Sequence, residues 1–266
     1  MMQNSSYAPY LDTALHLLDE ATALIERLTG ARIPTRKADG TLVTQTDQAV
    51  DELLAKRLGE IYPAHAVLSE ERTTTYDPAL RFTWVVDPID GTTNFARGLP
   101  VWGTSIALLE WGVPVVGAVG FPSLHETFSA SKGFGAALNR LPIATAGDRR
   151  VDSQHFIMCC TRTGRRYRVD TPLKPRILGS AAYHLLKVAD GSALAAIEAT
   201  PKIWDLAAAL LILAEAGGVV QPLSGRRPFP VPARAGDFRT HSFPLLAAAN
   251  PDILAAVSAQ ITEIGN

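Results

Sequence analysis

The stretch Asp87-Pro-Ile-Asp-Gly-Thr-Thr-Asn-Phe95 carries more information about fold and chemistry than any other part of this chain. Its first carboxylate ends a short β-rich run, Thr83–Asp87, and Pro88 is incompatible with a helix interior. Gly91 permits a tight turn, and the residues after it suit a short helix that Gly98 would end. Two carboxylates three residues apart in such a turn can converge on hard cations, and the following backbone N–H groups can hold a phosphate. The simpler alternative is a turn whose Asp side chains cap backbone donors.

The whole chain has the composition of a globular protein. It has 266 residues, of which 47% are hydrophobic and 19% charged, which excludes collagen, coiled coil and global disorder. The net charge of −1 gives no overall basic field for nucleic acid or an anionic membrane. The longest apolar run, Leu206–Ala214, has nine residues, whereas a membrane helix needs about 20.

Cysteine usage and the first residues predict the compartment. Cys159 and Cys160 are adjacent, an arrangement that rarely forms a disulfide and supplies no cluster for zinc. Residues 1–9 lack the basic stretch and apolar core of a signal peptide. We therefore predict a soluble, cytoplasmic protein that has no membrane or nucleic-acid partner.

Hydrophobic periodicity predicts two helices, then a sheet, then an alternating region. Helices are predicted over residues 10–29, ended by Gly30, and 47–60, the second preceded by a capping box at Thr44–Asp47. Residues 31–43 are predicted as a loop or hairpin. Strand patterns and turns from Phe82 to Ser131 predict an antiparallel meander. The remaining predicted elements are strands at 66–68, 155–160, 219–221 and 244–249, and helices at 180–189, 205–216 and 251–264.

Four motifs, in order along the chain, resemble the inositol monophosphatase family. Its members are magnesium-dependent, lithium-sensitive phosphomonoesterases related to fructose-1,6-bisphosphatase. Asp87–Phe95 resembles the family signature, and Leu68-Ser-Glu-Glu71 resembles its first acidic motif. Trp204-Asp205, followed by an apolar helix and Gly217-Gly218, resembles the second signature, and Leu42–Asp47 the early Val-Thr-X-X-Asp element. The similarity runs from about residue 10 to about residue 260.

The resemblance implies a fold of mixed α+β and α/β character, a layered αβαβα sandwich of the sugar-phosphatase type. We expect residues 1–145 to form an N-terminal α+β half with the antiparallel sheet and most metal ligands. Residues 146–266 would form a C-terminal α/β half that supplies Asp205 and substrate contacts.

The resemblance also implies a site with two or three Mg²⁺ ions. Glu70, Asp87 and the backbone carbonyl of Ile89 would hold one ion, and Asp87 would bridge to a second ion bound by Asp90 and Asp205. Hard oxygen ligands suit Mg²⁺, and two ions about 4 Å apart can stabilise the entering and leaving oxygens of an in-line displacement. Bound cations would also relieve the mutual repulsion of these carboxylates.

Further roles follow from the same resemblance. Asp47 and Thr92 would orient the water that attacks phosphorus, with Glu70 as a third catalytic residue. Backbone N–H groups of Gly91 and Thr92 would hold the phosphate. Alternatives remain, because Asp47 and Asp205 each begin a predicted helix, where Asp is a common N-terminal cap. Glu70 would also suit a surface pair of glutamates.

The resemblance implies substrate contacts on the far side of the phosphate. Glu198 precedes Asp205 by seven residues, the offset at which the family carries an acidic residue that contacts sugar hydroxyls. An ordinary exposed Glu198 is the alternative. Lys37 lies near a family lysine that approaches the metal site, or is an exposed loop residue. The implied substrate-binding set is Asp90, Gly91, Thr92, Ala181 in the stretch Gly179-Ser-Ala181, Glu198 and Asp205.

The chain departs from the family pattern in three places. Residues 162–176 form a short basic segment where many relatives have a longer stretch. We predict a solvated loop there, with substrate steering or a partner surface as the alternative. Ser69 replaces a common Gly, and Asn139-Arg140 replaces a common Asn-Gly. The shortened segment leaves substrate identity and subunit contacts open.

The predicted function is hydrolysis of a small polyol or sugar phosphate, with inositol 1-phosphate as first candidate, by a cytoplasmic homodimer. Fructose-1,6-bisphosphate stays open, because some family members hydrolyse both. Adenosine 3′,5′-bisphosphate nucleotidases usually carry Lys at the position of Thr93, and histidinol-phosphate phosphatases often carry Arg, so Thr93 argues against both. A catalytically silent regulator on the same fold is the alternative from a different class.

Overall fold

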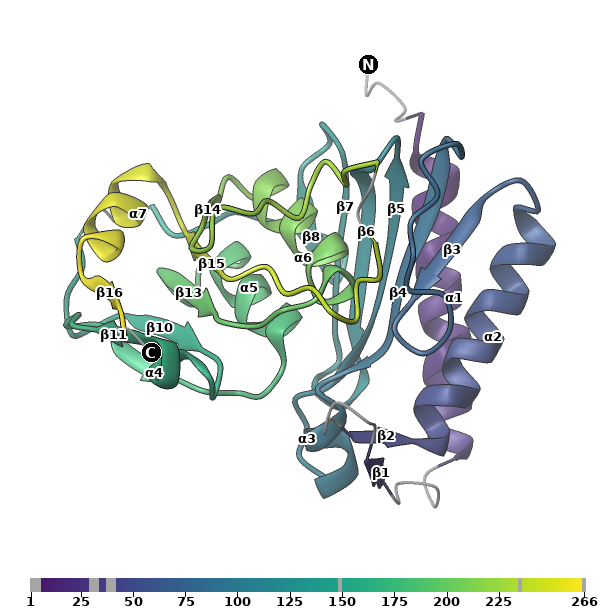
Figure 1. The fold of residues 1–266 in the computed structure, drawn as a ribbon, viewed down its shortest axis with the longest axis horizontal. Helices are drawn as coiled ribbons and strands as arrows, with labels where there is room; N and C mark the ends of the chain where they lie inside the picture. Colours follow the sequence, from purple (N-terminus) through teal and green to yellow (C-terminus); the bar gives the residue numbers. More distant parts are fainter. Residues whose placement is uncertain (1–5, 29–33, 37–41, 148–149, 234–235, 265–266) are drawn as a thin grey trace.

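The computed structural model describes residues 6–28, 34–36, 42–147, 150–233 and 236–264 (Figure 1). Its helices are α1 (Ala8–Arg27), α2 (Gln45–Ile61), α3 (Thr92–Arg97), the 3-10 helix η1 (Pro122–Leu124), α4 (Thr163–Arg166), α5 (Ala181–Ala189), α6 (Ile203–Glu215) and α7 (Pro251–Ser258). Its strands are β1 (Pro34–Arg36), β2 (Leu42–Thr44), β3 (Ala66–Ser69), β4 (Phe82–Asp90), β5 (Gly103–Glu110), β6 (Val113–Phe121), β7 (Glu126–Ser131), β8 (Ala136–Leu138), β9 (Leu141–Ile143), β10 (Phe156–Cys159), β11 (Tyr167–Val169), β12 (Lys174–Arg176), β13 (Ala195–Glu198), β14 (Val219–Pro222), β15 (Leu245–Ala248) and β16 (Ile261–Glu263).

Helical layers alternate with two large sheets. The seven-stranded sheet has the order β3-β4-β5-β6-β7-β8-β9 and is antiparallel except for the parallel pair β3 and β4. The five-stranded sheet has the mixed order β12-β10-β13-β15-β14. Helices α1 and α2 cover the outer face of the larger sheet, α5 and α6 lie between the sheets, and α7 packs on the smaller sheet (Figure 1). The layered αβαβα sandwich and the meander are thus confirmed.

The burial of each helix explains its sequence pattern. Helix α1 buries one stripe, which includes Leu17, Ala21 and Ile25, as expected for a helix with one face toward a sheet. Helix α6 lies between two sheets, so it is apolar on nearly all sides and contains the nine-residue apolar run. It approaches β6 closely, because a Cβ atom added to Gly117 would stand 2.9 Å from the carbonyl oxygen of Ala208. The core is therefore continuous from α6 into both sheets.

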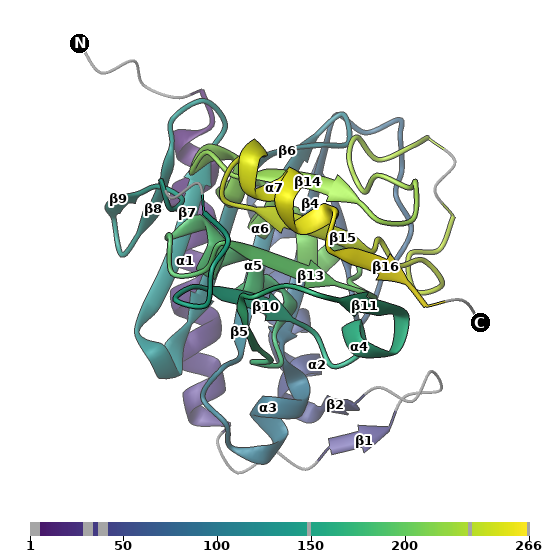
Figure 2. The same cartoon turned by 90° about the vertical axis from the view of Figure 1, so that its left-hand side faces the viewer.

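The prediction for residues 251–264 is wrong beyond its first two turns. Helix α7 ends at Ser258, and β16 follows it. The reason is non-local, since β16 pairs antiparallel with β11, nearly one hundred residues earlier in the chain (Figure 2). No described helix has the length and hydrophobicity that crossing a membrane would require.

The prediction of a loop at residues 162–176 is also wrong. The segment forms α4, β11 and β12, with β12 added to the edge of the smaller sheet beside β10. The predicted hairpin before α2 is confirmed by the antiparallel pair β1 and β2, while Gly30 and Lys37 lie outside the described residues. The division of the chain at residue 145 stays a prediction.

Candidate active site

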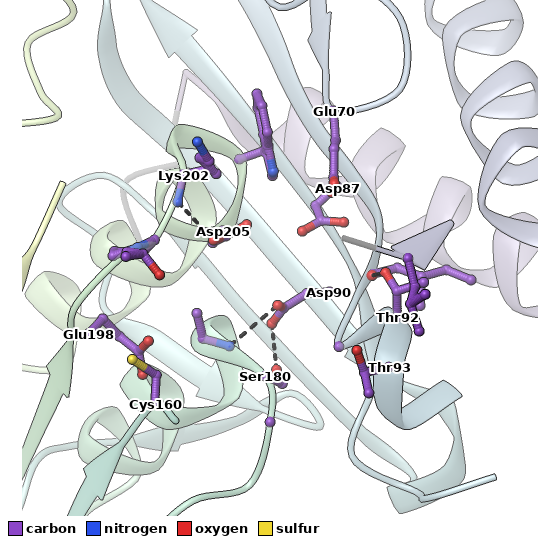
Figure 3. A pocket seen from close by; sticks show the side chains of 18 of the residues that line it. Glu70, Asp87, Asp90, Thr92, Thr93, Cys160, Ser180, Glu198, Lys202 and Asp205 are labelled. Carbon is purple, nitrogen blue, oxygen red and sulfur yellow. Dashed lines mark hydrogen bonds between the residues drawn. The ribbon is translucent and has the colours of Figure 1, made fainter. Parts of the chain in front are cut away.

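The predicted site residues come together around one cavity with a volume of about 780 Å³ (Figure 3). The end of β4 and the start of α3 form one side, and the first turns of α5 and α6 form the other. Asp47 does not line the cavity, and its carboxylate lies within hydrogen-bond distance of the Thr92 hydroxyl, which does. The predicted residues on the wall are Glu70, Asp87, Ile89, Asp90, Gly91, Thr92, Ala181, Glu198 and Asp205.

The end of β4 turns its carboxylates into this cavity because its pairing is irregular. The register with β5 shifts between Asp87 and Asp90, and the Thr104 hydroxyl donates a 2.8 Å hydrogen bond to the Pro88 carbonyl at the irregularity. Gly91 follows with a φ of +86°, and a Cβ atom there would lie 2.9 Å from a backbone oxygen. Only glycine fits this backbone, which explains its place in the motif.

Asp87, Asp90 and Asp205 form the acidic centre of the cavity. Each offers one carboxylate oxygen, and these oxygens all lie within 4.8 Å of one another. Among the described residues, the Oδ1 atom of Asp87 has no hydrogen-bond partner although it is buried. Burial and the nearby charge of Glu70 raise the pKa of Asp87 well above its usual range, and burial with the charge of Asp90 does the same for Asp205. Hard oxygen donors with an orphaned oxygen fit a divalent cation such as Mg²⁺.

Asp90 differs from Asp87 in that the start of helix α5 supplies hydrogen-bond donors to its carboxylate. Its carboxylate accepts hydrogen bonds from the Ser180 hydroxyl at 2.5 Å and from the backbone N–H groups of Ala182 at 2.9 Å and Ala181 at 3.3 Å. Burial raises the pKa of Asp90, and these hydrogen bonds oppose the rise. Ser180 also caps α5 by accepting from the Tyr183 N–H at 3.1 Å. Nothing in the sequence indicated this role of Ser180, although the residue lies inside the matched stretch Gly179-Ser-Ala181.

For Asp47 and Asp205, capping a helix leaves room for the further role that the family resemblance implies. Asp205 lies in the carboxylate centre, yet its Oδ2 atom accepts a 2.8 Å hydrogen bond from the Lys202 N–H at the start of α6. Asp47 completes the predicted capping box, in which its carboxylate accepts from the Thr44 N–H at 2.8 Å and from the Thr44 hydroxyl. Capping thus fixes each carboxylate without using all of its acceptor capacity.

Asp47 and Thr92 form a second polar group at the end of β4. The Thr92 hydroxyl lies 3.2 Å from Asp47 Oδ1 and 2.9 Å from the Ile89 carbonyl, and its single proton can serve one of these acceptors at a time. Burial raises the pKa of Asp47, and the hydrogen bonds from Thr44 oppose the rise. The pair can hold a polar molecule in a defined orientation at this edge of the cavity.

Glu198 is a fully buried carboxylate on the opposite wall, so the exposed alternative is wrong. It is 2% exposed, and burial raises its pKa well above the usual range. Its Oε1 atom lies 2.5 Å from Nδ1 of His184 in α5, and the Cys160 thiol stands beside it (Figure 3). Burial lowers the pKa of His184 to about 4. No motif in the sequence pointed to His184, because its partner lies on β13.

Cationic side chains border the same cavity at its outer edge: Arg162, Lys202 and Arg239. We call these three residues the cationic rim. The Arg162 guanidinium donates to the Thr200 hydroxyl at 2.9 Å, and the Arg239 guanidinium donates to the Arg72 carbonyl at 3.1 Å. Within the basic segment 162–176, which is described throughout, Arg162 is the residue that lines the cavity.

Comparisons with known proteins agree with this geometry. The sequence matches the inositol monophosphatase family over residues 7–261. The chain belongs to the inositol monophosphatase family. The family predicted from the four motifs is thus confirmed, and with it the class of phosphoric monoester hydrolase.

Relatives within the family carry different names. A histidinol-phosphatase of Mycobacterium tuberculosis is 38% identical over 231 residues, which cover 80% of this chain and 86% of that protein. An inositol-1-monophosphatase of Synechocystis is 34% identical over 233 residues, covering 81% of this chain and 79% of that protein. The crystal structure of the extragenic suppressor protein suhB from Bartonella henselae superposes with a TM-score of 0.80 at 26% identity, covering 95% of this chain and 98% of that one.

Proposed function

We propose that this chain is a Mg²⁺-dependent phosphomonoesterase of small polyol or sugar phosphates, with inositol 1-phosphate as its leading substrate. The observation that supports this most strongly is the close approach of the carboxylate oxygens of Asp87, Asp90 and Asp205. Among the described residues, the buried Oδ1 atom of Asp87 has no hydrogen-bond partner. Glu70 and the Ile89 carbonyl, on the same wall, complete the proposed donor set for two or three ions. Bound Mg²⁺ would supply Lewis-acid stabilisation of the phosphate charge and a more acidic water.

The protein itself contributes orientation. Asp47 would accept a proton or hydrogen bond from the attacking water, and the Thr92 hydroxyl, between two acceptors, would fix the water on one side of the phosphate. The N–H groups of Gly91 and Thr92 would hold the phosphate oxygens. Glu70 would take part as the third catalytic residue, since its charge already acts on Asp87.

Substrate preference would depend on the wall opposite the acidic centre. The Glu198 carboxylate can accept hydrogen bonds from neighbouring hydroxyls of a polyol, and Ala181 lines the same side. Thr93 is short and neutral on the cavity wall, so it offers no charge to a second phosphate. Buried polar groups of this kind discriminate strongly against analogues that lack the matching hydroxyl.

The cationic rim favours a second candidate, fructose-1,6-bisphosphate. Arg162, Lys202 and Arg239 would meet the second phosphate of a longer substrate, and the cavity volume of about 780 Å³ leaves room for one. Histidinol phosphate also enters the test, because one relative is named histidinol-phosphatase, although Thr93 argues against it.

Phosphate release is the decisive measurement. We expect Mg²⁺-dependent hydrolysis that EDTA abolishes, with kcat/KM highest for inositol 1-phosphate among that ester, fructose-1,6-bisphosphate, histidinol phosphate and adenosine 3′,5′-bisphosphate. Glu198→Gln should lower kcat/KM for inositol 1-phosphate about tenfold or more. Full activity in EDTA would refute the metal mechanism, and no activity on any ester would favour a catalytically silent regulator.

The remaining parts of the proposal concern lithium and assembly. We expect Li⁺ at high millimolar concentration to inhibit, because it can replace an ion that must leave with product. We also expect a cytoplasmic homodimer that has no nucleic-acid or membrane partner. Light scattering with and without RNA and anionic vesicles tests the assembly, and a monomer or a bound partner would contradict it.

A further inference from the structure

His184 has a single protonation arrangement that satisfies its surroundings. Its ring is 1% exposed. The backbone N–H of Leu178 donates to Nε2 at 2.9 Å, so Nε2 carries no proton. The one proton of the neutral ring therefore resides on Nδ1 and is donated to Oε1 of Glu198 at 2.5 Å. The direction of the second hydrogen bond follows from the first.

This arrangement defines what Glu198 can offer to a ligand. One of its oxygens already accepts the His184 N–H, which fixes the plane of the carboxylate on the cavity wall. The thiol of Cys160 beside Glu198 is also held in place. Its sulfur accepts a 3.4 Å hydrogen bond from the backbone N–H of Ala199, the residue after Glu198. An oriented carboxylate loses less conformational entropy when it binds a hydroxyl.

We propose that His184 is a positioning residue that orients Glu198 to accept hydrogen bonds from substrate hydroxyl groups, and thereby sets the preference for polyol esters. The proposal rests on the proposed function, because it assigns the substrate contact to Glu198. His184 touches no reacting atom, and its effect passes through one carboxylate.

A purely structural role makes a different prediction. The Leu178 hydrogen bond ties His184 to the segment before α5, where the Leu178 carbonyl accepts from Asn94 Nδ2 at 2.7 Å and Ser180 donates to Asp90. If this link were the purpose of His184, its loss would disturb Asp90 and impair every substrate equally. The two hydrogen bonds of the ring must therefore be removed separately.

Two substitutions separate them. His184→Asn can place an amide N–H where Nδ1 stands, so it keeps a donor for Glu198 and gives up the acceptor for Leu178. His184→Gln can place its amide oxygen where Nε2 stands, so it keeps the acceptor for Leu178 and gives up the donor for Glu198. Each variant is the control for the other, and both have one buried amide in place of the ring.

Steady-state kinetics on two esters test the proposal. For inositol 1-phosphate, His184→Gln should raise KM about tenfold while kcat stays within about threefold, since the buried Glu198 oxygen would lose its hydrogen-bond donor and its fixed orientation. For p-nitrophenyl phosphate, whose leaving group has no neighbouring hydroxyls, both parameters should stay within about twofold. His184→Asn should match the wild type within about threefold on both esters. Glu198→Gln should have the same effect as His184→Gln. The double variant should be little worse than either single variant, because the two residues act as one unit.

Four results would overturn the proposal. Equal losses on both esters in His184→Gln would indicate a structural role. Selective loss in His184→Asn with normal His184→Gln would assign the effect to Leu178. A wild type active on both esters with an unchanged preference in His184→Gln would contradict the role of His184 while leaving the proposed function intact. A wild type inactive on both esters would contradict the proposed function, and the role of His184 would fall with it.

Discussion

Asp87 and Glu198 are both buried carboxylates on one cavity, but the protein treats them differently. Asp87 Oδ1 has no hydrogen-bond partner among the described residues, and its neighbours Asp90 and Asp205 are also acidic. Glu198 accepts a hydrogen bond from a neutral histidine and has a thiol beside it. The first environment calls for a cation, whereas the second is suited to a neutral hydroxyl ligand.

The comparison also concerns how each carboxylate is held. Asp87 sits at an irregularity of β4, where the backbone of the sheet fixes its position. Glu198 ends β13 and depends on a side chain from α5 for its orientation. Substitution at the acidic centre should therefore remove the reaction, and substitution at the opposite wall should change the substrate preference.

Asp87→Asn should have the largest effect. Loss of the proposed bridging ligand should lower kcat/KM by more than about 100-fold, since even outer contacts of metal sites cost 10–100-fold. Mg²⁺ should raise the Tm of the wild type, because it binds the folded state, and this rise should disappear in Asp87→Asn. Phosphate release and thermal unfolding with Mg²⁺ or EDTA measure both effects, with Asp19→Asn on the exposed face of α1 as the control. Wild-type turnover in Asp87→Asn would show that the acidic centre does not bind the catalytic ion.

Asp47→Asn should come next, with a loss of about 100-fold in kcat, because a positioned base contributes about 10²–10⁴-fold. Thr92→Ala should also be impaired, and the double variant should be little worse than the worse single variant, since residues that act as one unit are not additive. Kinetics of the four proteins form the cycle. Fully multiplicative losses would leave Asp47 with its capping role at α2 and no joint role with Thr92.

These expectations show which parts of the molecule were accessible from sequence. The turn in the motif Asp87–Phe95 could be predicted, because it depends on the backbone preferences of Pro88 and Gly91 and on the short helix that follows them. The structure confirms this turn and the helix. The strand before it extends to Asp90, three residues beyond the prediction, because pairing with β5 continues after the register shift. Local signals locate an element, and neighbouring strands determine where it ends.

Non-local contacts account for what the sequence did not predict. The strand β16 exists because β11 lies beside it, and neither segment has a distinctive pattern of its own. In the sequence, nothing distinguishes His184 from the other residues of its largely apolar helix. Its role becomes visible only in the fold, where β13 places Glu198 beside its ring. From the sequence, Asp47 was a cap or a water-orienting residue and Asp205 a cap or a metal ligand. In the structure both cap their helices, and Asp205 also lies in the acidic centre.

The buried histidine and the buried carboxylates of the cavity should have opposite effects on the pH dependence of stability in the absence of metal. Burial lowers the pKa of His184 to about 4, so between pH 4 and about 6.5 the unfolded chain binds more protons, and stability rises with pH. The free energy of unfolding that depends on a neutral His184 is about 3 kcal/mol, and it is lost as the pH falls from about 6.5 to 4. The raised pKa values of Asp87 and Glu198 act in the reverse direction above about pH 4, where the folded chain holds more protons.

Chemical unfolding in EDTA at several pH values tests this difference. His184→Asn should remove the rise in stability between pH 4 and 6.5, and Asp87→Asn should reduce the loss of stability at higher pH. A pH profile of His184→Asn that parallels the wild type throughout would mean that the ring is not the group that titrates.

The smallest effect is expected from a substitution that displaces α6, the helix that carries Asp205. It tests whether the packing of α6 on β6 sets the position of Asp205 in the acidic centre. Gly117 and Gly120 lie on β6 and face opposite sides of the larger sheet. A Cβ atom at Gly117 would meet backbone atoms of Ala208 in α6 at 2.9 and 3.0 Å, whereas one at Gly120 would meet the Leu18 side chain at 3.6 Å. Gly117→Ala should therefore destabilise the protein by about 1–3 kcal/mol and weaken Mg²⁺ binding several-fold, because α6 must move. Gly120→Ala should change stability by less than about 1 kcal/mol. Urea unfolding and Mg²⁺ titration measure both, and equal effects of the two substitutions would show that the contact of α6 with β6 does not position Asp205.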